Sequence, residues 1–300
     1  MKRNIRQVII LLVLTCLVAN LAYGCGNNST DKDAKNAEPY LIGGSDASTK
    51  PDDKNDPISK QFSKKNFDLK NLDDSIAYAI IKTNCKSSRS TGECFGEGHK
   101  ILDKYTKDGQ TVVCMLVIEG YMGFENDVLT CVSGSCIPSQ LVFTKNKDGE
   151  YELKSYKTPM DGTYYPASLK KIFTKKALLK LDNTDPDELA PQFEEYGKKY
   201  LKSIGREAMV QWNTVIKETP NIKSADVSNK LFSQFEDYPY WIGTQERIED
   251  GKRIVYCHKW ESDGKGGGTS TFRKEIYNGK ILEESVVTVK GDKYTVVKTK

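Results

Sequence analysis

The chain has 300 residues with 38% hydrophobic and 10% aromatic content, which is enough for a folded core and excludes wholesale disorder. The same composition excludes collagenous, coiled-coil and multi-span membrane proteins. Its 45 Lys and Arg residues are interleaved with 41 Asp and Glu, so the formal charge of +4 is not concentrated, and we expect no nucleic-acid partner.

The first 24 residues have the pattern of a secretory signal peptide. Lys2, Arg3 and Arg6 precede an apolar run, Val8 to Val18, that is too short to span a bilayer comfortably. Removal of residues 1–24 takes away these three basic residues and no acid, and lowers the formal charge from +4 to +1. The slight basicity of the chain therefore belongs to its leader.

A lipid-attachment sequence follows the apolar run. Leu21–Cys25 (LAYGC) resembles a bacterial lipoprotein processing site, with Gly24 directly before the cysteine that is acylated. We expect Cys25 to be diacylated and to anchor the mature protein at the extracytoplasmic face of the cell membrane. Two acyl chains hold a protein stably in a bilayer, whereas a single acyl chain does not. The alternative is cleavage by the ordinary signal peptidase, which would release a secreted protein.

Composition then divides the mature chain into three parts. Residues 25–67 are rich in small and polar residues and are predicted to form a flexible tether. A first folded unit is expected over residues 68–182 and a second over residues 183–300. Each combines helix with an antiparallel β-meander, so the predicted fold class is α+β, with two small units.

The first unit is expected to begin with a helix. This helix would be capped by Asp73 or Asp74 and run through Lys82. The unbroken apolar run Thr111 to Ile118 predicts a central strand that is covered on both faces. Asp-Gly pairs, which are typical of tight hairpin turns, stand at Asp108–Gly109 and Asp148–Gly149. A helix over Pro166 to Leu181 closes the unit.

The second unit is expected to begin with a longer helix. Asp187 is the predicted cap and Gly205 the predicted end. Its apolar face consists of Leu189, Phe193, Tyr196, Tyr200 and Ile204. A shorter helix is predicted over Ser224 to Phe235, and strands follow to the C-terminus, with Asn278–Gly279 as the strongest hairpin signal.

Six cysteines remain once the leader is removed and the anchor cysteine is acylated. An even number in an exported protein predicts that at least some of them pair, although the connectivity stays open. Cys131 and Cys136 bracket a Gly-containing segment that predicts a tight turn, and Cys85 and Cys94 bracket a polar loop. We therefore expect two local disulfides, Cys131–Cys136 and Cys85–Cys94.

Cys114 and Cys257 lie in predicted strands, one in each unit, and two buried free thiols are expected there, with a long-range bond as the alternative. Zinc would need a set such as Cys85, Cys94 and His99 with Cys131 or Cys136. No Cys-x-x-Cys pair is present, so we expect no metal and no other cofactor.

Motifs for catalysis are incomplete. Ser168 and Lys171 satisfy Ser-x-x-Lys, but the Ser-Asp-Asn and Lys-Thr-Gly motifs that accompany it in penicillin-recognising enzymes are absent from the sequence. The aromatic cluster Tyr238 to Trp241 is interpreted as a linker packed on a sheet, with a stacking site for a ligand as the alternative. The sequence therefore favours a protein that is not an enzyme.

From about Leu72 to its end, the chain resembles the extracytoplasmic C-terminal region of BlaR/MecR-like antirepressor membrane metallopeptidases of Gram-positive anaerobes. The segments that carry the resemblance are EGHKIL (97–102), GFEN (123–126), VSGS (132–135), PMDGTYY (159–165), KYLKSIGR (199–206) and WIGTQERIEDG (241–251). The membrane-spanning peptidase part, its zinc motif and the transpeptidase-like sensor motifs are absent from the sequence. Cys131 and Cys136 flank VSGS where the family pattern has other residues, and this departure favours their pairing with each other.

The resemblance implies a sensor-like or accessory module without catalysis, here carried by a lipid. The expected partner is a cell-wall ligand or a membrane protein, in addition to the membrane that holds the anchor. Two alternatives stay open, a thiol-dependent enzyme and a structural or adhesive surface protein. Tyr121 to Asn126 and Pro159 to Tyr165 contain Gly and aromatic residues and predict exposed binding loops.

Overall fold

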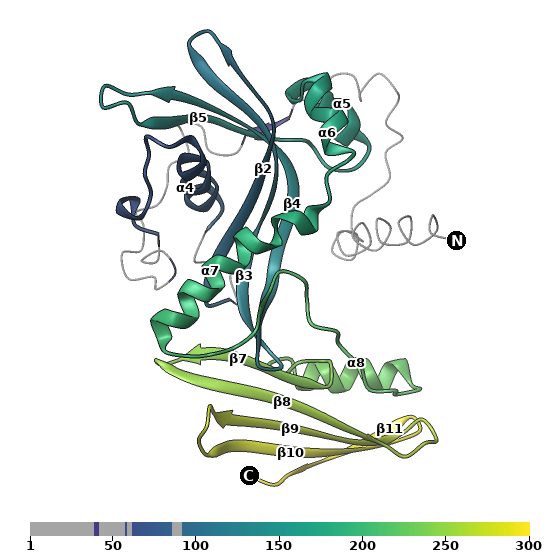
Figure 1. Cartoon of the computed structure of the whole chain (residues 1–300). Coiled ribbons are helices and arrows are strands. Elements are labelled where there is room, and N and C mark those ends of the chain that lie inside the picture. Colours follow the sequence, from purple (N-terminus) through teal and green to yellow (C-terminus); the bar gives the residue numbers. More distant parts are fainter. Residues whose placement is uncertain (1–38, 42–57, 59–61, 86–91) are drawn as a thin grey trace. The chain divides into compact units, whose positions relative to one another are not determined.

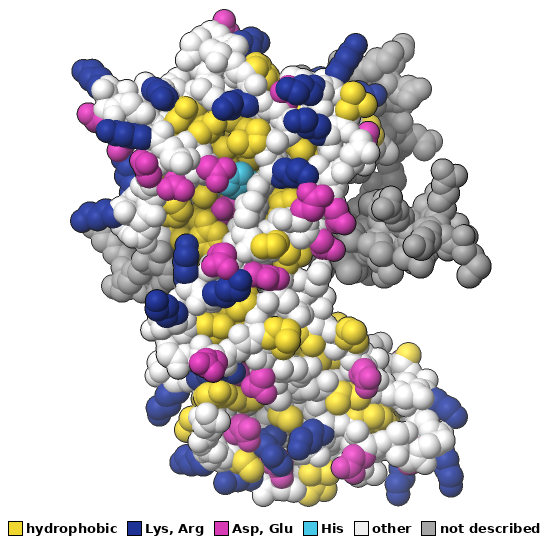
Figure 2. Space-filling model, viewed as in Figure 1, with side chains coloured by type: hydrophobic (Ala, Val, Ile, Leu, Met, Phe, Trp, Pro, Cys, Tyr) yellow, Lys and Arg dark blue, Asp and Glu magenta, His cyan; other side chains and the backbone are white. Residues whose placement is uncertain are grey.

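The computed structural model describes residues 39–41, 58, 62–85 and 92–300 (Figure 1). Contacts group residues 38–300 as one compact unit, and every element below belongs to it. The predicted leader, Cys25 and most of the predicted tether lie outside the described residues. None of the helices in the described ranges is long and apolar enough to cross a membrane. On the face shown in Figure 2, basic and acidic side chains are interspersed.

The first half of this unit is built on four long antiparallel strands. They are β2 (Cys94–Lys107), β3 (Gln110–Glu125), β4 (Val128–Lys145) and β5 (Tyr151–Thr158), and β1 (Tyr40–Leu41) adds to the outer edge of β5. Along β3, Val113 and Met115 pack into one apolar cluster, whereas Cys114 and Leu116 pack into another. The alternating side chains of a strand point to opposite faces. The prediction of a strand covered on both faces is therefore confirmed.

One apolar cluster is closed by α4 (Leu72–Asn84), whose Ile76 and Ile80 are fully buried. The helix begins two residues earlier than a cap at Asp73 predicts. The N-cap is Asn71, because its side-chain oxygen accepts a hydrogen bond from the N–H of Asp73 at 2.8 Å. The predicted cap residues instead occupy the first turn, where their negative charge favours the helix N-terminus.

The other apolar cluster is covered by α5 (Tyr165–Ile172), α6 (Lys175–Leu181) and α7 (Ala190–Ile204). The single helix predicted over Pro166 to Leu181 is in fact two, because Phe173 is extended and Thr174 caps α6 through a 3.0 Å bond from Ala177 N–H. The predicted cap at Asp187 is also wrong. It lies in the 3-10 turn η4 (Pro186–Leu189), and Pro191 stands in the first turn of α7, where no N–H is needed.

Gly96 lets α7 approach β2 closely, and it stands in a row of glycines across the sheet. Gly96, Gly120 and Gly134 lie in register across β2, β3 and β4. A Cβ on Gly96 would lie 3.0 Å from the backbone oxygen of Phe193 in α7, so only glycine fits without a shift. The helix ends as predicted at Gly205, which adopts a left-handed conformation with φ 65°.

The second half is a five-stranded antiparallel meander, formed by β7 (Gly243–Glu249), β8 (Lys252–Ser262), β9 (Gly268–Ile276), β10 (Ile281–Lys290) and β11 (Lys293–Lys298). The predicted helix near residues 224–235 is confirmed as α8 (Ala225–Gln234), with Ser224 as its cap. Its Val227 and Leu231 pack on Phe272, Val287 and Val289 of the sheet. Asn278, with φ 53°, forms the predicted turn between β9 and β10.

The tip of the β3–β4 hairpin joins the two meanders. Asn126 accepts a hydrogen bond from Thr244 N–H at 2.8 Å and donates its own N–H to the Thr244 carbonyl at 3.0 Å. Glu125 pairs with Gln245, and β6 (Val210–Gln211) adds a short parallel pair to β4. An 11-stranded, almost wholly antiparallel sheet results, which confirms the α+β class. The helix α7 belongs to the predicted second unit, residues 183–300, but it packs on β2 of the predicted first unit, residues 68–182 (Figure 1).

Candidate functional site

Two arginines and two glutamates form a nearly buried ion-pair network where the C-terminal end of α7 meets β7 and β8. Arg253 binds Glu93 with both terminal nitrogens, at 2.6 and 2.7 Å. Arg206 binds Glu246 in the same bidentate manner, at 2.7 and 2.9 Å. A 2.9 Å bond from Arg253 to Glu246 links the two pairs. Such paired bonds fix the direction of each guanidinium as well as its position.

Aromatic rings and one hydroxyl complete the network. The Arg206 guanidinium lies 3.6 Å from the ring centroid of Phe124 and 4.4 Å from that of Tyr277. Tyr200 donates its hydroxyl to Glu93 at 2.5 Å. Burial opposes the charge of Arg253, but hydrogen bonds to Glu93 and Glu246 outweigh it and raise its pKa above the usual value. Both arginines therefore stay charged and held in place.

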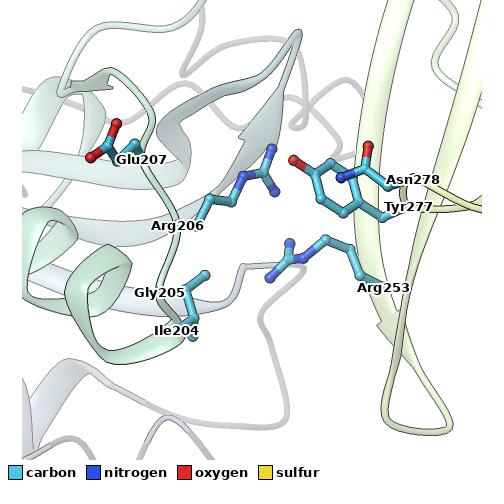
Figure 3. A pocket seen from close by; sticks show the side chains of 7 residues that line it. All are labelled: Ile204, Gly205, Arg206, Glu207, Arg253, Tyr277 and Asn278. Atoms are coloured by element: carbon cyan, nitrogen blue, oxygen red, sulfur yellow. The ribbon is translucent and has the colours of Figure 1, made fainter.

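A pocket of about 450 Å³ opens beside this network. Its lining residues are Ile204, Gly205, Arg206, Glu207, Arg253, Tyr277 and Asn278 (Figure 3). Figure 3 shows the Arg206 and Arg253 side chains and the Tyr277 ring turned toward a common space, whereas the Glu207 carboxylate points away from it. The volume of this open pocket lies in the range of small-ligand sites, and its lining is more polar than is usual for them.

The pocket has hydrogen-bonding capacity to spare. An arginine carries five N–H donors. The Nε–H groups of Arg206 and Arg253 make no hydrogen bond with any described residue, and neither does the side-chain amide of Asn278. The charges of the two guanidiniums are nevertheless balanced by the carboxylates of Glu93 and Glu246. The site thus offers oriented donors with little net positive charge.

The predicted disulfide between Cys131 and Cys136 does not fit the structure. Both residues lie within the continuous strand β4, and the predicted tight turn between them is absent. Five residues of strand span about 16 Å, well beyond the roughly 4.4–6.8 Å that a disulfide requires between α-carbons. The thiols of both residues are unbonded. Gly134 lies between them as a close-packing residue opposite Gly120 and makes no turn.

The second predicted disulfide, Cys85–Cys94, stays a prediction. Cys85 follows the last residue of α4 and Cys94 begins β2, while the connecting residues 86–91 lie outside the described residues. The pKa of Cys94 is raised by burial, by Glu93 and by the Cys85 thiol. Cys85 packs against the apolar cluster that contains Phe95, the residue after Cys94.

Several cysteines are protected from reaction by burial, which raises the pKa of Cys131 to about 12 and that of Cys136 to about 11. Burial also raises the pKa of Cys114 and of Cys257. A thiol with a raised pKa is a poor nucleophile at neutral pH. Over the described ranges, no three Cys, His, Asp or Glu side chains converge as metal ligands.

His99 lies elsewhere, 5% exposed on β2, with both ring nitrogens occupied. Nδ1 lies 2.9 Å from Glu97 Oε2, and Nε2 lies 3.1 Å from Asp73 Oδ1. Burial disfavours the charged ring, but the bonds to Asp73 and Glu97 prevail and raise its pKa to about 9. Tyr196 donates to the second oxygen of Glu97 at 3.0 Å. His99 therefore joins α4 to the sheet as a charged structural residue.

The Ser168 hydroxyl is engaged with backbone groups of its own helix region. It donates toward the carbonyls of Tyr164 and Tyr165, at 2.8 and 3.1 Å, and accepts from Met160 N–H at 2.8 Å. These contacts hold the loop before α5 against the helix. They occupy the oxygen that a Ser-x-x-Lys mechanism would use for attack.

One of the two predicted binding loops is not a loop. Tyr121 to Glu125 forms the end of β3 and is buried, and only Asn126 stands in a turn. Pro159 to Tyr165 does form a partly exposed connection that includes η3 (Gly162–Tyr164). Neither segment lines the pocket. The segment Tyr238 to Trp241 is interpreted from the sequence as a linker packed on a sheet. This agrees with the burial of Trp241 and with the 5.4 Å between the ring centroids of Tyr238 and Phe272, a residue of β9.

The residues of the pocket were not predicted from the sequence as a site. Glu93 and Arg253 are separated by 160 residues, so no local motif could join them. Arg206 and Glu246 do fall in two of the segments that carry the resemblance, and Asn278 falls in the strongest hairpin signal. These were the available signals. Comparison adds no further guide, because no protein-family model, curated protein or solved structure matches the chain.

Proposed function

We propose that this protein is a non-catalytic binding module of the cell envelope, anchored through a lipid on Cys25, and that the pocket at Arg206, Arg253 and Tyr277 receives its ligand. The observation that carries the proposal is the combination of a rigid ion-pair network with hydrogen-bond donors that no described residue uses. Rigid, pre-oriented donors favour binding because little freedom is lost when a ligand arrives.

Chemistry at the other polar residues favours binding over catalysis. The buried thiols have raised pKa values, the nitrogens of His99 are both bonded, and the Ser168 hydroxyl is engaged by its own helix. An enzyme needs a nucleophile next to a base, with an open space for the substrate. The thiol-dependent enzyme is therefore the weaker alternative.

Envelope binding is tested by co-sedimentation of the full mature chain, in detergent, with isolated cell walls. Tyr277→Ala removes a pocket wall and should weaken the apparent affinity at least tenfold. Tyr240→Ala is the matched control, because Tyr240 is 55% exposed and does not line the pocket. Equal binding by all three proteins would contradict the pocket, and would favour the structural or adhesive alternative.

The anchor is tested separately by cell fractionation. Cys25→Ala removes the acylated thiol, so the protein should leave the membrane fraction and enter the medium or the soluble extracytoplasmic fraction. Unchanged membrane partitioning of Cys25→Ala would contradict lipid anchoring without bearing on the pocket.

A further inference from the structure

We infer that the pocket takes a neutral, hydroxyl-rich ligand, namely a saccharide of about disaccharide size. The inference rests on the proposed function and names the ligand class of the same site. Its starting point is the volume of about 450 Å³, which lies in the range of small-molecule sites.

Charge balance separates a neutral ligand from an anionic one. Glu93 balances the charge of Arg253, and Glu246 that of Arg206, through bidentate bonds. A third carboxylate, that of Asp127, lies 3.4 Å from Arg206. An anion in the pocket would lose hydration and meet no uncompensated positive charge. The two arginines therefore act here as fixed hydrogen-bond donors and give no net attraction for a carboxylate or a phosphate.

A cationic ligand is disfavoured by the same residues. The C-terminal end of α7 faces the pocket and carries partial negative charge. Two guanidiniums stand in the same wall, however, and they stay protonated because Glu93 and Glu246 raise their pKa values against the effect of burial. The one carboxylate among the lining residues, Glu207, points away from the pocket (Figure 3), so a cation meets no free carboxylate there.

The remaining groups match the surface of a sugar. Hydroxyl groups accept hydrogen bonds as well as donate them, so they suit the Nε–H donors of Arg206 and Arg253 and the amide of Asn278. Tyr277 contributes a flat apolar ring with a hydroxyl at its tip, and Ile204 contributes a second apolar wall. A sugar ring has apolar C–H faces and polar edges, and both kinds of surface find a counterpart here.

Two substitutions at residues with the same backbone conformation make the test specific. Asn278 has φ 53° in an Asn-Gly turn, and Asp108 has φ 51° in an Asp-Gly turn that does not line the pocket. Glycine adopts this conformation readily. Asn278→Gly therefore removes the pocket amide and preserves the turn, whereas Asp108→Gly is the same kind of change at an unrelated hairpin.

The experiment is a calorimetric titration of the full mature chain in detergent with N,N′-diacetylchitobiose, a neutral disaccharide, and in parallel with succinate. We expect the disaccharide to bind, succinate to bind at least tenfold more weakly, Asn278→Gly to weaken disaccharide binding at least fivefold, and Asp108→Gly to leave it unchanged.

Tighter binding of succinate, or equal weakening by both substitutions, would overturn the saccharide inference. Absence of disaccharide binding would also overturn it, and the cell-wall co-sedimentation then decides what remains. If that binding still depends on Tyr277, the pocket stands with another ligand. If the dependence on Tyr277 is absent as well, the proposed function itself is wrong.

Discussion

The guanidinium of Arg253 and the carboxylate of Glu93 form a bidentate pair, with nitrogen–oxygen distances of 2.6 and 2.7 Å. The pair ties the start of β8 to the residue directly before β2. The side chains are only 15% and 4% exposed, so water screens the interaction weakly. The pair fixes one wall of the pocket, and its removal should affect stability and binding together.

Glu93→Gln should lower the free energy of unfolding by about 3 kcal/mol, because it leaves the buried Arg253 charge without its main partner. Urea denaturation of the two proteins measures the difference. Lys154→Met is the control, since it breaks a pair with Glu152 whose side chains are about half exposed, and it should change stability by less than about 1 kcal/mol. Similar losses in both variants would contradict a special role for the buried pair.

His99 should make stability depend on alkaline pH. Its pKa is about 9 in the folded chain and about 6.5 when unfolded, so its contribution is complete below pH 6.5 and is lost as the pH rises through 9. The shift corresponds to about 3 kcal/mol. The stability difference between wild type and His99→Gln should therefore shrink between pH 6.5 and 9. A difference that is constant with pH would show that folding does not raise the pKa of His99.

Native thiols should react slowly. The raised pKa values of Cys131 and Cys136, about 12 and about 11, keep both protonated at pH 7.5. We expect labelling by iodoacetamide, followed by mass spectrometry, to be at least tenfold slower at both than at free glutathione, and to become fast in urea. A selectively fast thiol in the native protein would support the thiol-dependent enzyme.

The mature protein should contain at most one local disulfide. The strand geometry of β4 separates Cys131 from Cys136, whereas Cys85 and Cys94 stay the predicted pair. Intact-mass analysis without reductant should give a loss of about 2 Da, because one disulfide removes two hydrogens. Peptide mapping should place the bond between Cys85 and Cys94, and a bond between Cys131 and Cys136 would contradict the continuous strand.

Local signals in the sequence predicted much of the fold. Asp-Gly and Asn-Gly pairs predicted hairpin turns, and Asp108 and Asn278 indeed have positive φ. Gly205 predicted the end of α7, and Thr111 to Ile118 predicted the doubly covered strand. These features depend on a few neighbouring residues, whose conformational preferences are strong enough to decide the local structure.

The wrong predictions of turns and loops arose at glycines, because glycine occurs both in turns and where two strands pack closely. Gly134 between serines favours a turn, but in the structure it provides close packing opposite Gly120. The glycine-containing segment before Asn126 suggested a loop, yet it extends β3 to Glu125. In both cases pairing between the neighbouring strands β3 and β4 decided the outcome. The pocket could not be predicted, because its residues come from segments far apart in the chain.

Hydrogen exchange with and without purified cell-wall glycan tests the central claim most directly, because it asks where on the full mature chain a ligand binds. We predict that protection increases in the peptides that contain residues 204–207 and 277–278. The exposed segment at residues 159–165, which does not line the pocket, should be unaffected. Protection at residues 159–165 or on the edge strand β11, with none at the pocket, would contradict the account.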